Sequence, residues 1–598
     1  MKTAFFQSFE ASPDREEIPF RLTMVQAELK KNNLSGYLVP RSDVHQGEYV
    51  AACDERLSWL TGFTGSAGIC IVGNDRAGVF VDGRYSIQAK KQTKSPFEVT
   101  QWNKKNFLQW IEKNIVKGEI GFDPWLHSHK EINGLSEAFA HTGIGFVPSD
   151  NLIDKVWLTR PLKVLSEAMS YPLKLAGLTA KDKCKQIAEI IKFKKADTAV
   201  ITLPDSIAWL LNLRGNDVIH NPILHAFLII NSKGKIELFC NSEDISNSIT
   251  GLKSFVKVST LENFETSLTK LNGPVLLDDT TVPFATVKIL QSNSCKLIMG
   301  EDPIILPKAC KNHVELKHAR LCHKRDAVHM CEFLSWVDRQ SEKEFDEIDA
   351  VIELEKIRRK DENLKEISFD TIAASGPNAA LPHYRVNYSS NRTIKSGEVL
   401  LVDSGGQYLD GTTDITRTIA IGTQSKEVKD AFTRVLKGLI AISELKFPCG
   451  TSGRDIDAFA RAPLWQIGQD YAHGTGHGVG HYLSVHEGPQ RISKFSDVEF
   501  KEGMIVSNEP GFYKEGKFGI RIENLILVKD TEFKTDNSFL EFETLTFVPI
   551  DRRLISVSLL DSYELEWINN YHSQCWKRAK DLVTAVTKAW LKTMTRPL

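Results

Sequence analysis

The stretch VLLVDSGGQYLDGTTDITRTIAIG, residues 399–422, decides how the C-terminal half of the chain folds. Its apolar start predicts a buried strand that runs into Asp403. The Gly-Gly and Asp-Gly pairs that follow predict turns, and a second strand then carries Asp414. Both aspartates fit ordinary turn positions poorly, because an aspartate at the end of an apolar run is costly to bury without a partner. Two such side chains facing each other would repel unless a cation lay between them.

A second informative segment is DYAHGTGHGVGHYLSVHEGP, residues 470–489, which contains His473, His477, His481 and His486. His473 and His477 are four residues apart, as in helical zinc motifs. The glycines within residues 474–480 nevertheless favour a loop, in which backbone and imidazoles can approach a small site closely. A single histidine would ordinarily be structural, but four within this loop favour a site.

The third segment, MIVSNEPGFYKEGKFGIRIENLILV, residues 504–528, adds two glutamates. Glu509 precedes a Pro-Gly turn, and Glu523 lies in a run with strand-like alternation. Arg521 shares a strand face with Glu523 in this pattern, so its guanidinium would keep that carboxylate ionised. The alternative is an exposed surface pair, but the apolar neighbours favour burial.

These segments supply four carboxylates and one imidazole: Asp403, Asp414, His477, Glu509 and Glu523. That is too much negative charge for one divalent cation, and two cations balance it better. Oxygen-rich ligands with one histidine and no thiolate suit Mn, Co or Fe(II) at least as well as Zn. Because two metal ions can generate a bridging hydroxide, the residues predict metal-assisted hydrolysis, with no substrate indicated.

The N-terminal half contains a faint internal repeat, which predicts two related α/β domains near residues 1–162 and 163–315. Ser58-Trp59-Leu60 recurs as Ala208-Trp209-Leu210, and Asp123 echoes Asp279. Chance similarity is the alternative, but Gly65 and Gly215 are separated by the same number of residues as the two tryptophans, which favours repetition. A region at 316–538 with long helices and the site motifs follows, including a helix N-capped by Ser425, and residues 539–598 form a helical C-terminal extension.

Composition indicates a water-soluble globular chain. The 598 residues include 75 Lys and Arg against 76 Asp and Glu, so nothing suggests nucleic acid or an anionic membrane as a partner. Ten cysteines are too few for a disulfide scaffold and suit a reducing compartment. No apolar run approaches the roughly 18 residues of a membrane span, and the N-terminus lacks a signal-peptide pattern. We therefore expect a cytoplasmic protein.

The motifs VDSGGQYLDGTTDITRT, HGTGHGVGHYLSVHEGP, SNEPGFY and GIRIEN resemble those of the pita-bread metallopeptidases of family M24B, in particular three-domain aminopeptidase P. DERLSWLTGFTGSAG and VDGRYSIQA are similar to the first domain of that family, and DSIAWLLNLRG to its second. The resemblance implies two creatinase-like N-terminal α/β domains followed by a pita-bread catalytic domain, an α/β and α+β multidomain architecture.

The resemblance also implies roles for the candidate residues. Two metal ions, most often manganese, would be bridged by Asp414 and Glu523, with Asp403 on one ion and His477 and Glu509 on the other. Glu509 would in addition act as the general base on the bridging water. Further positions would line the substrate pocket or support the ligands: His383 in LPHY, His473, His486 and, beside Glu523, Arg521. Pro382 and His481 depart slightly from the family pattern, and neither is a ligand position.

The reaction implied is release of the N-terminal residue from peptides whose second residue is proline, by a homodimeric enzyme. A prolidase, which cleaves only Xaa-Pro dipeptides, would use the same five ligands. The duplicated N-terminal region favours the aminopeptidase over a prolidase or the shorter methionine aminopeptidases. A non-catalytic relative that binds peptides or histones would have no need to retain four costly carboxylates.

Overall fold

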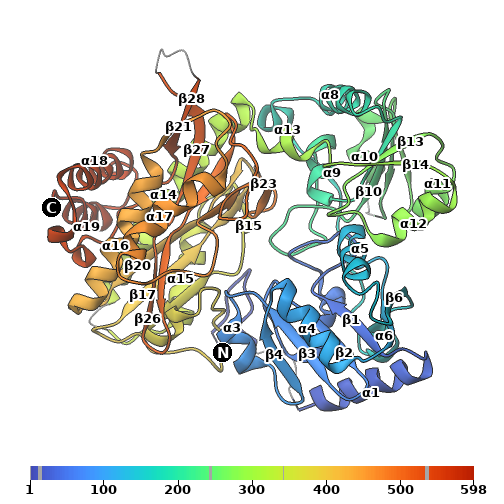
Figure 1. The fold of residues 1–598 in the computed structure, drawn as a ribbon. Helices are drawn as coiled ribbons and strands as arrows, with labels where there is room; N and C mark the ends of the chain where they lie inside the picture. Colours follow the sequence, from blue (N-terminus) through green and yellow to red (C-terminus); the bar gives the residue numbers. More distant parts are fainter. Residues whose placement is uncertain (1, 11–15, 242–244, 341–342, 533–537) are drawn as a thin grey trace. The chain divides into compact units, whose positions relative to one another are not determined.

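The computed structural model describes residues 2–10, 16–241, 245–340, 343–532 and 538–598. They divide into an N-terminal unit, Ser12–Ile305, and a C-terminal unit made of Leu306–Leu598 together with Met1–Ala11. In Figure 1 the N-terminal unit runs from blue to green and the C-terminal unit from yellow-green to red. The predicted order of α/β domains followed by a mixed domain is confirmed.

The first domain of the N-terminal unit is a six-stranded sheet with helices on both faces. Alternate residues of β1 (Gly36–Pro40) face different cores: Tyr37 and Val39 pack with helix α1 (Ile18–Lys31), whereas Leu38 packs with α4 (Lys104–Asn114). The sheet order is β4-β3-β2-β1-β5-β6. The other elements are β2 (Ile69–Gly73), β3 (Ala77–Val81), β4 (Phe97–Gln101), β5 (Gly118–Phe122), β6 (Ile144–Pro148), α2 (Arg56–Thr61), α3 (Ser86–Gln92), α5 (His129–Ala138) and α6 (Leu152–Val156).

The second domain repeats this topology. Its sheet order, β12-β11-β10-β8-β13-β14, has the same succession of parallel and antiparallel pairs as the first. Its strands are β8 (Thr198–Ile201), β10 (Phe227–Asn231), β11 (Ile236–Phe239), β12 (Val256–Ser259), β13 (Pro274–Leu277) and β14 (Lys296–Met299), and its main helices are α8 (Ala180–Phe193), α9 (Pro204–Leu211), α11 (Asn263–Leu268) and α12 (Phe284–Ser292). The predicted duplication is therefore visible in the fold.

One detail of the predicted repeat is off by one residue. Trp59 in α2 and Trp209 in α9 occupy equivalent helices, each between the first two strands of its sheet. Asp123, however, is the first residue after β5 and accepts a hydrogen bond from the amide two positions on. Asp278, not Asp279, is in the matching position after β13 and accepts the matching bond from Thr280.

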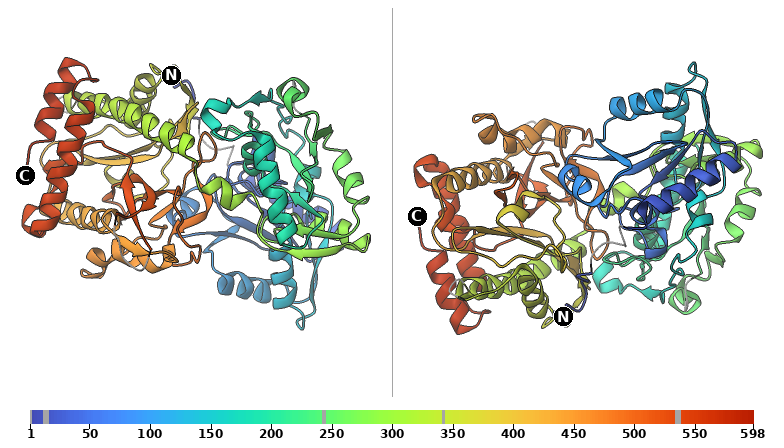
Figure 2. Two further views of the ribbon diagram at one scale, coloured as in Figure 1. Left: turned by 90° about the horizontal axis from the view of Figure 1, so that it is seen from above. Right: turned by 90° about the horizontal axis from the view of Figure 1, so that it is seen from below.

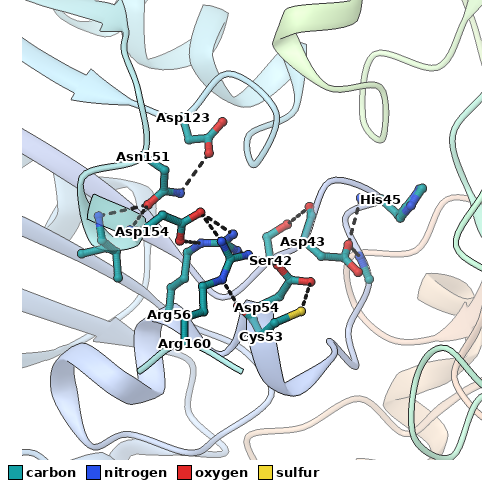
Figure 3. A network of polar contacts seen from close by, with 12 residues as sticks. Ser42, Asp43, His45, Cys53, Asp54, Arg56, Asp123, Asn151, Asp154 and Arg160 are labelled. Atoms are coloured by element: carbon teal, nitrogen blue, oxygen red, sulfur yellow. Dashed lines mark hydrogen bonds and ion pairs between the residues drawn. The ribbon is translucent and has the colours of Figure 1, made fainter. Parts of the chain in front are cut away.

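A charged network ties two helices of the first domain together (Figure 3). Arg56 donates to Asp154 at 2.7 Å and to Asp54 at 2.8 Å. Arg160 donates to the same two carboxylates, at 2.6 and 3.3 Å. Two guanidinium groups thus balance two carboxylates, which links α2 to α6 without leaving an unpaired charge.

In the C-terminal unit, antiparallel sheets lie among helices (Figure 1). One sheet has the order β16-β17-β20 and another β21-β28-β27-β24-β22-β23. Their strands are β16 (Ile372–Ser375), β17 (Val399–Ser404), β20 (Ile415–Ala420), β21 (Lys446–Pro448), β22 (Gly476–Gly478), β23 (Glu487–Ile492), β24 (Ile505–Asn508), β27 (Asn524–Asp530) and β28 (Phe539–Thr544). Smaller sheets contain β15 (Leu364–Ile367), β18 (Gly406–Tyr408) and β19 (Gly411–Thr412), and the hairpin β25 (Gly511–Lys514) with β26 (Phe518–Arg521).

The main helices of this unit are α14 (His313–Gln340), α15 (Glu347–Arg358), α16 (Lys426–Ser443), α17 (Gly453–Trp465), α18 (Ser562–Ala579) and α19 (Ala585–Met594). Ser425 caps α16 as predicted, accepting a hydrogen bond from the Val428 amide. The last two helices pack on α14. Among the described residues, none of the helices is both long and apolar enough to cross a membrane.

Arg417 on β20 joins the C-terminal extension to this core. The residue is 1% exposed, and the five N–H groups of its guanidinium are shared among six oxygens within hydrogen-bond distance. These are the carbonyls of Thr416, Glu523, Val548 and Pro549, the Asn524 side chain and the Tyr571 hydroxyl. Because every one of these oxygens is buried, Arg417 holds together strands and a helix that are distant in sequence.

Candidate metal centre

The first two candidate ligands are brought together by one antiparallel strand pair. Asp403 is on β17, and Asp414 directly precedes β20. The register places Asp403 opposite Thr416 and Ser404 opposite Ile415. The predicted strand–turn–strand arrangement of residues 399–422 is therefore present, with both aspartates buried.

The other three candidates come from the six-stranded sheet. His477 lies on β22, Glu509 follows β24, and Glu523 precedes β27. Asn508 of β24 pairs with Asn524 of β27, so the two glutamates flank one residue pair. The amide of Glu523 donates to Thr416 of β20 at 3.1 Å, which connects the two sheets at the site.

Three side chains form a cluster that could hold a metal ion. One ligand atom from each of Asp414, His477 and Glu523 lies within 4.8 Å of the others. His477 Nε2 is 3.5 Å from a carboxylate oxygen of Asp414 and 3.5 Å from one of Glu509. Nδ1 of the same ring is 2.9 Å from the Gly478 carbonyl, so Nδ1 donates there and Nε2 faces the carboxylates.

The buried carboxylates repel one another electrostatically. Burial, opposed by Arg521 and reinforced by the charges of Asp414 and Glu509, raises the pKa of Asp403 from 3.8 to about 6. Burial and the charges of Asp414, Glu509 and Asp403 raise the pKa of Glu523 well above its ordinary value. Asp403 Oδ1 is buried without a hydrogen-bond partner among the described residues. Such an orphaned oxygen within an oxygen-rich donor set fits divalent cations.

His477 reports the same excess of negative charge. Burial alone would lower its pKa, but the hydrogen bond to Asp414 and the charge of Glu509 raise the pKa from 6.5 to about 9. A proton on Nε2 therefore compensates the carboxylates in the metal-free chain, and a bound cation would replace it.

These shifts predict how metal and pH affect stability together. For all three groups the folded chain binds protons more tightly than the unfolded chain, so the free energy of unfolding of metal-free protein falls as pH rises. The stabilising contribution of the Asp403 proton is lost between pH 3.8 and about pH 6, and that of the His477 proton between pH 6.5 and about pH 9. Added Mn(II) should therefore raise the thermal midpoint more at about pH 8 than at about pH 5. An equal rise at both pH values, by differential scanning fluorimetry, would contradict this.

Two hydroxyl groups that hold the ligands were missed in the sequence. Thr416 Oγ1 donates to Glu523 at 2.7 Å, and Ser507 Oγ donates to Glu509 at 3.1 Å. Ser507 Oγ also accepts the His477 amide at 2.9 Å. Each hydroxyl lies two residues from a candidate ligand, so strand alternation places it on the same face and could have identified it.

Arg521 is linked to Glu523 through the Thr416 hydroxyl, which accepts from Arg521 Nε at 3.2 Å and donates to Glu523 at 2.7 Å, and not by the direct pair that alternation predicts. Its guanidinium pairs with Asp403 at 2.5 Å and not with Glu523. Strand β26 ends at Arg521 and β27 begins at Asn524, so the alternation assumed between residues 521 and 523 is interrupted by a chain turn. The buried location predicted for Arg521 is correct, since the residue is 3% exposed.

The three candidate pocket histidines, His383, His473 and His486, lie in different surroundings. His486 lies against the cluster, with its ring 4.4 Å from that of His477, edge to face. His473 Nε2 is 2.9 Å from the Tyr513 hydroxyl, which in turn accepts from Arg521 at 2.6 Å. His383 lies half-buried in the loop after the 3-10 helix η3 (Gly376–Ala380), and η3 packs on β26. His481, which departs from the family pattern, is buried at 3% exposure.

Tyr513 connects Arg521 to His473 and was not singled out in the sequence. Replacing Tyr513 by phenylalanine removes both hydrogen bonds while retaining the ring. We expect this change to lower kcat by about tenfold or more without loss of bound metal, because groups behind a metal site orient its ligands. Steady-state kinetics with metal analysis checks it, and an unchanged kcat would show that the hydroxyl link is dispensable.

The chain matches known sequence families along nearly its whole length. Residues 317–530 match metallopeptidase family M24, and residues 538–598 match the C-terminal region of that peptidase family. Residues 21–156 and 159–315 each match a creatinase/prolidase N-terminal domain.

Similar full-length proteins come from fungi. "Probable Xaa-Pro aminopeptidase P" of Talaromyces marneffei is 38% identical over 605 residues, covering 97% of this chain and 92% of the relative. The protein of the same name from Laccaria bicolor is 37% identical over 607 residues, with 97% and 93% covered.

A solved structure matches over the same extent. The X-prolyl aminopeptidase of Caenorhabditis elegans, described as a cytosolic enzyme with a di-nuclear active site, superposes with a TM-score of 0.92 at 32% identity. The match covers 97% of this chain and 100% of that one. The chain therefore belongs to metallopeptidase family M24, within the group of relatives that carry the name Xaa-Pro aminopeptidase P.

Proposed function

We propose that the chain is a dinuclear, metal-dependent aminopeptidase that hydrolyses the bond between an N-terminal residue and a following proline. The observation that carries the proposal is the cluster of Asp414, His477 and Glu523, with Glu509 3.5 Å from the imidazole and Asp403 electrostatically coupled to it. Family membership over the full chain supplies the substrate class, which the side chains alone do not indicate.

We assign Asp414 and Glu523 to both ions, Asp403 to one, and His477 and Glu509 to the other. When bound, the two ions would neutralise the carboxylates and activate a water molecule for attack on the peptide carbonyl carbon. Glu509 would accept the proton of that water at a carboxylate oxygen, and Ser507 holds this carboxylate in place.

The remaining polar side chains would act on the substrate. We assign His383, His473 and His486 to the pocket, where an imidazole can donate to the developing oxyanion or carry a proton to the leaving proline nitrogen. Arg521 would fix the orientation of Asp403, to which it is bonded, and through Tyr513 that of His473.

The proposal is tested with purified protein, Mn(II) and three peptides. Arg-Pro-Pro should release free arginine, and Arg-Ala-Ala should remain intact. The dipeptide Arg-Pro separates this activity from that of a prolidase, for which the dipeptide would be the preferred substrate. Absence of arginine release from Arg-Pro-Pro would refute the proposal, and peptide binding without cleavage would instead indicate a non-catalytic relative.

We further propose manganese as the native metal, a cytoplasmic location and a homodimer. The similar C. elegans enzyme is described as cytosolic, which supports the location. We also propose these domain boundaries: two creatinase-like domains at 1–162 and 163–315, a catalytic domain at 316–538, and its C-terminal extension at 539–598. Metal analysis of protein purified without chelators tests the first point, and light scattering coupled to size exclusion tests the oligomeric state.

A further inference from the structure

The first described residues of the chain are part of the C-terminal unit. We call residues 2–10 the N-terminal arm. The chain enters the C-terminal unit with this arm, then builds the whole N-terminal unit, and returns only at Leu306. In both views of Figure 2 the N-terminal end lies beside the yellow-green helices α14 and α15.

The arm is bonded to α15 and to the edge of a sheet that carries a candidate ligand. The Phe5 and Phe6 amides donate to the two carboxylate oxygens of Glu355 on α15, the second at 3.0 Å. The Gln7 side chain, 3% exposed, forms two bonds with the Thr371 backbone, of 2.8 and 3.2 Å. Thr371 directly precedes β16, whose Ile372 pairs with Asp403.

The arm also contacts the loop that carries His383. The Tyr388 amide donates to the Phe9 carbonyl at 3.0 Å, and the Tyr388 hydroxyl donates to the Lys2 carbonyl at 2.8 Å. The rings of Phe9 and Tyr388 pack edge to face, 6.1 Å apart. Phe9 is 2% exposed and belongs to the same core as Tyr384 and Val386 of this loop. Backbone, ring and hydroxyl contacts thus converge on Tyr388.

The other restraints on this loop lead to the same region. Tyr384, next to His383, donates its hydroxyl to Glu347 of α15 at 2.9 Å. Arg385 pairs with Asp370 at 2.8 Å, and Asp370 adjoins the Thr371 backbone that Gln7 holds. The half of the loop beyond His383 is therefore held by the arm directly, through Tyr388, and indirectly, through residues 370–371.

We propose that the N-terminal arm is a positioning element that holds the loop of residues 381–388 so that His383 can engage the substrate. The inference rests on the proposed function, which places His383 in the substrate pocket. Its physical basis is that a displacement of about 1 Å in a positioning group can cost about a hundredfold in rate. The arm touches none of the five candidate metal ligands, so its loss should affect substrate and not metal.

The test compares the full chain with a chain lacking residues 2–10, using Arg-Pro-Pro and Mn(II). Deletion should raise KM or lower kcat/KM by about tenfold to about a hundredfold while bound metal stays at the level of the full chain. Adding the peptide of residues 1–12 should restore most of the loss. The same peptide with Gln7→Ala and Phe9→Ala should not. Because a peptide that binds the folded state also stabilises it, the thermal midpoint of the deletion chain is measured alongside, and loss of kcat/KM well below that midpoint is expected of a positioning role.

Point variants in the full chain decide the question if the deletion chain does not fold. Tyr388→Phe removes only the bond to the Lys2 carbonyl and should raise KM by about fivefold. Lys2→Ala is the matched control, because it removes the half-exposed ion pairs to Asp346 and Asp349 but leaves that carbonyl in place. Equal KM values for Tyr388→Phe and the full chain, or metal loss without peptide rescue, would overturn the proposal. An inactive full chain would instead refute the proposed function.

Discussion

Replacing Asp414 by asparagine is expected to abolish metal binding and activity while the fold survives. Asparagine has the size of aspartate but lacks the charge that, in our assignment, is shared between two cations. Because metal ions contribute several kcal/mol to hydrolytic transition states, kcat should fall on the order of a thousandfold or more. The metal-free variant should be no less stable than the metal-free parent, since one of several repelling buried carboxylates is gone.

Metal content, kcat and the thermal midpoint measured together distinguish a ligand from a structural residue. Asp410→Asn is the matched control in the same stretch. Asp410 is 7% exposed and pairs with Arg325 at 2.5 Å, away from the imidazole and glutamates of the cluster. The Asp410→Asn variant should lose some stability and keep its bound metal. Global unfolding of Asp414→Asn would show that this residue is structural, and two bound ions in the variant would remove it from the ligand set.

The second large effect is expected for Arg417→Met, on stability. Methionine fills part of the space but removes every N–H group that the Arg417 guanidinium donates, and the Glu523 and Pro549 carbonyls have no other donor among the described residues. Unsatisfied buried polar groups cost about 1–3 kcal/mol each, so even partial rearrangement should cost about 3 kcal/mol or more. The unfolding midpoint of the C-terminal unit should fall by about 5 °C or more.

Scanning calorimetry at fixed metal concentration measures this effect, and Arg320→Met controls for loss of an arginine. Arg320 also makes two hydrogen bonds, both to Glu543 and both 2.8 Å, but the two side chains are 44% and 30% exposed. Exposed ion pairs contribute about 1 kcal/mol or less, so this control should scarcely move the midpoint. Equal shifts of the unfolding midpoint in the two variants would mean that burial of Arg417 adds nothing to its contribution to stability.

The local alternation of apolar, polar and turn residues was enough to predict which ligand side chains each strand carries. Asp403 and Asp414 follow from apolar runs broken by turn residues, and the Ser425 cap follows from helical periodicity. The duplicated sheets could be predicted because Trp59 and Gly65 recur with unchanged spacing as Trp209 and Gly215. These features depend on residues within a few positions of one another, where periodicity carries information.

The contacts that pattern could not predict join residues far apart in sequence. Arg521 pairs with Asp403 across 118 positions, and Gln7 binds Thr371 across 364. Strand alternation suggested Glu523 as the direct partner of Arg521. Because β26 ends at Arg521, that alternation does not continue, and tertiary packing places Asp403 beside the guanidinium instead. Arg417 in TDITRT was likewise unremarkable in sequence, because five of its six partners lie more than 100 residues away, in three separate segments.

The entry of the chain into its C-terminal unit before its N-terminal unit imposes an order on folding during synthesis. Residues 2–10 leave the ribosome before the N-terminal unit does, but Thr371 and Tyr388, which bind them, are made only after the whole of Ser12–Ile305. At about 5–20 residues per second, the arm lacks its partners for tens of seconds, during which Phe9, which is 2% exposed in the folded chain, is open to solvent. The two α/β domains can fold meanwhile, whereas the C-terminal unit is completed only when the arm meets Glu355, Thr371 and Tyr388.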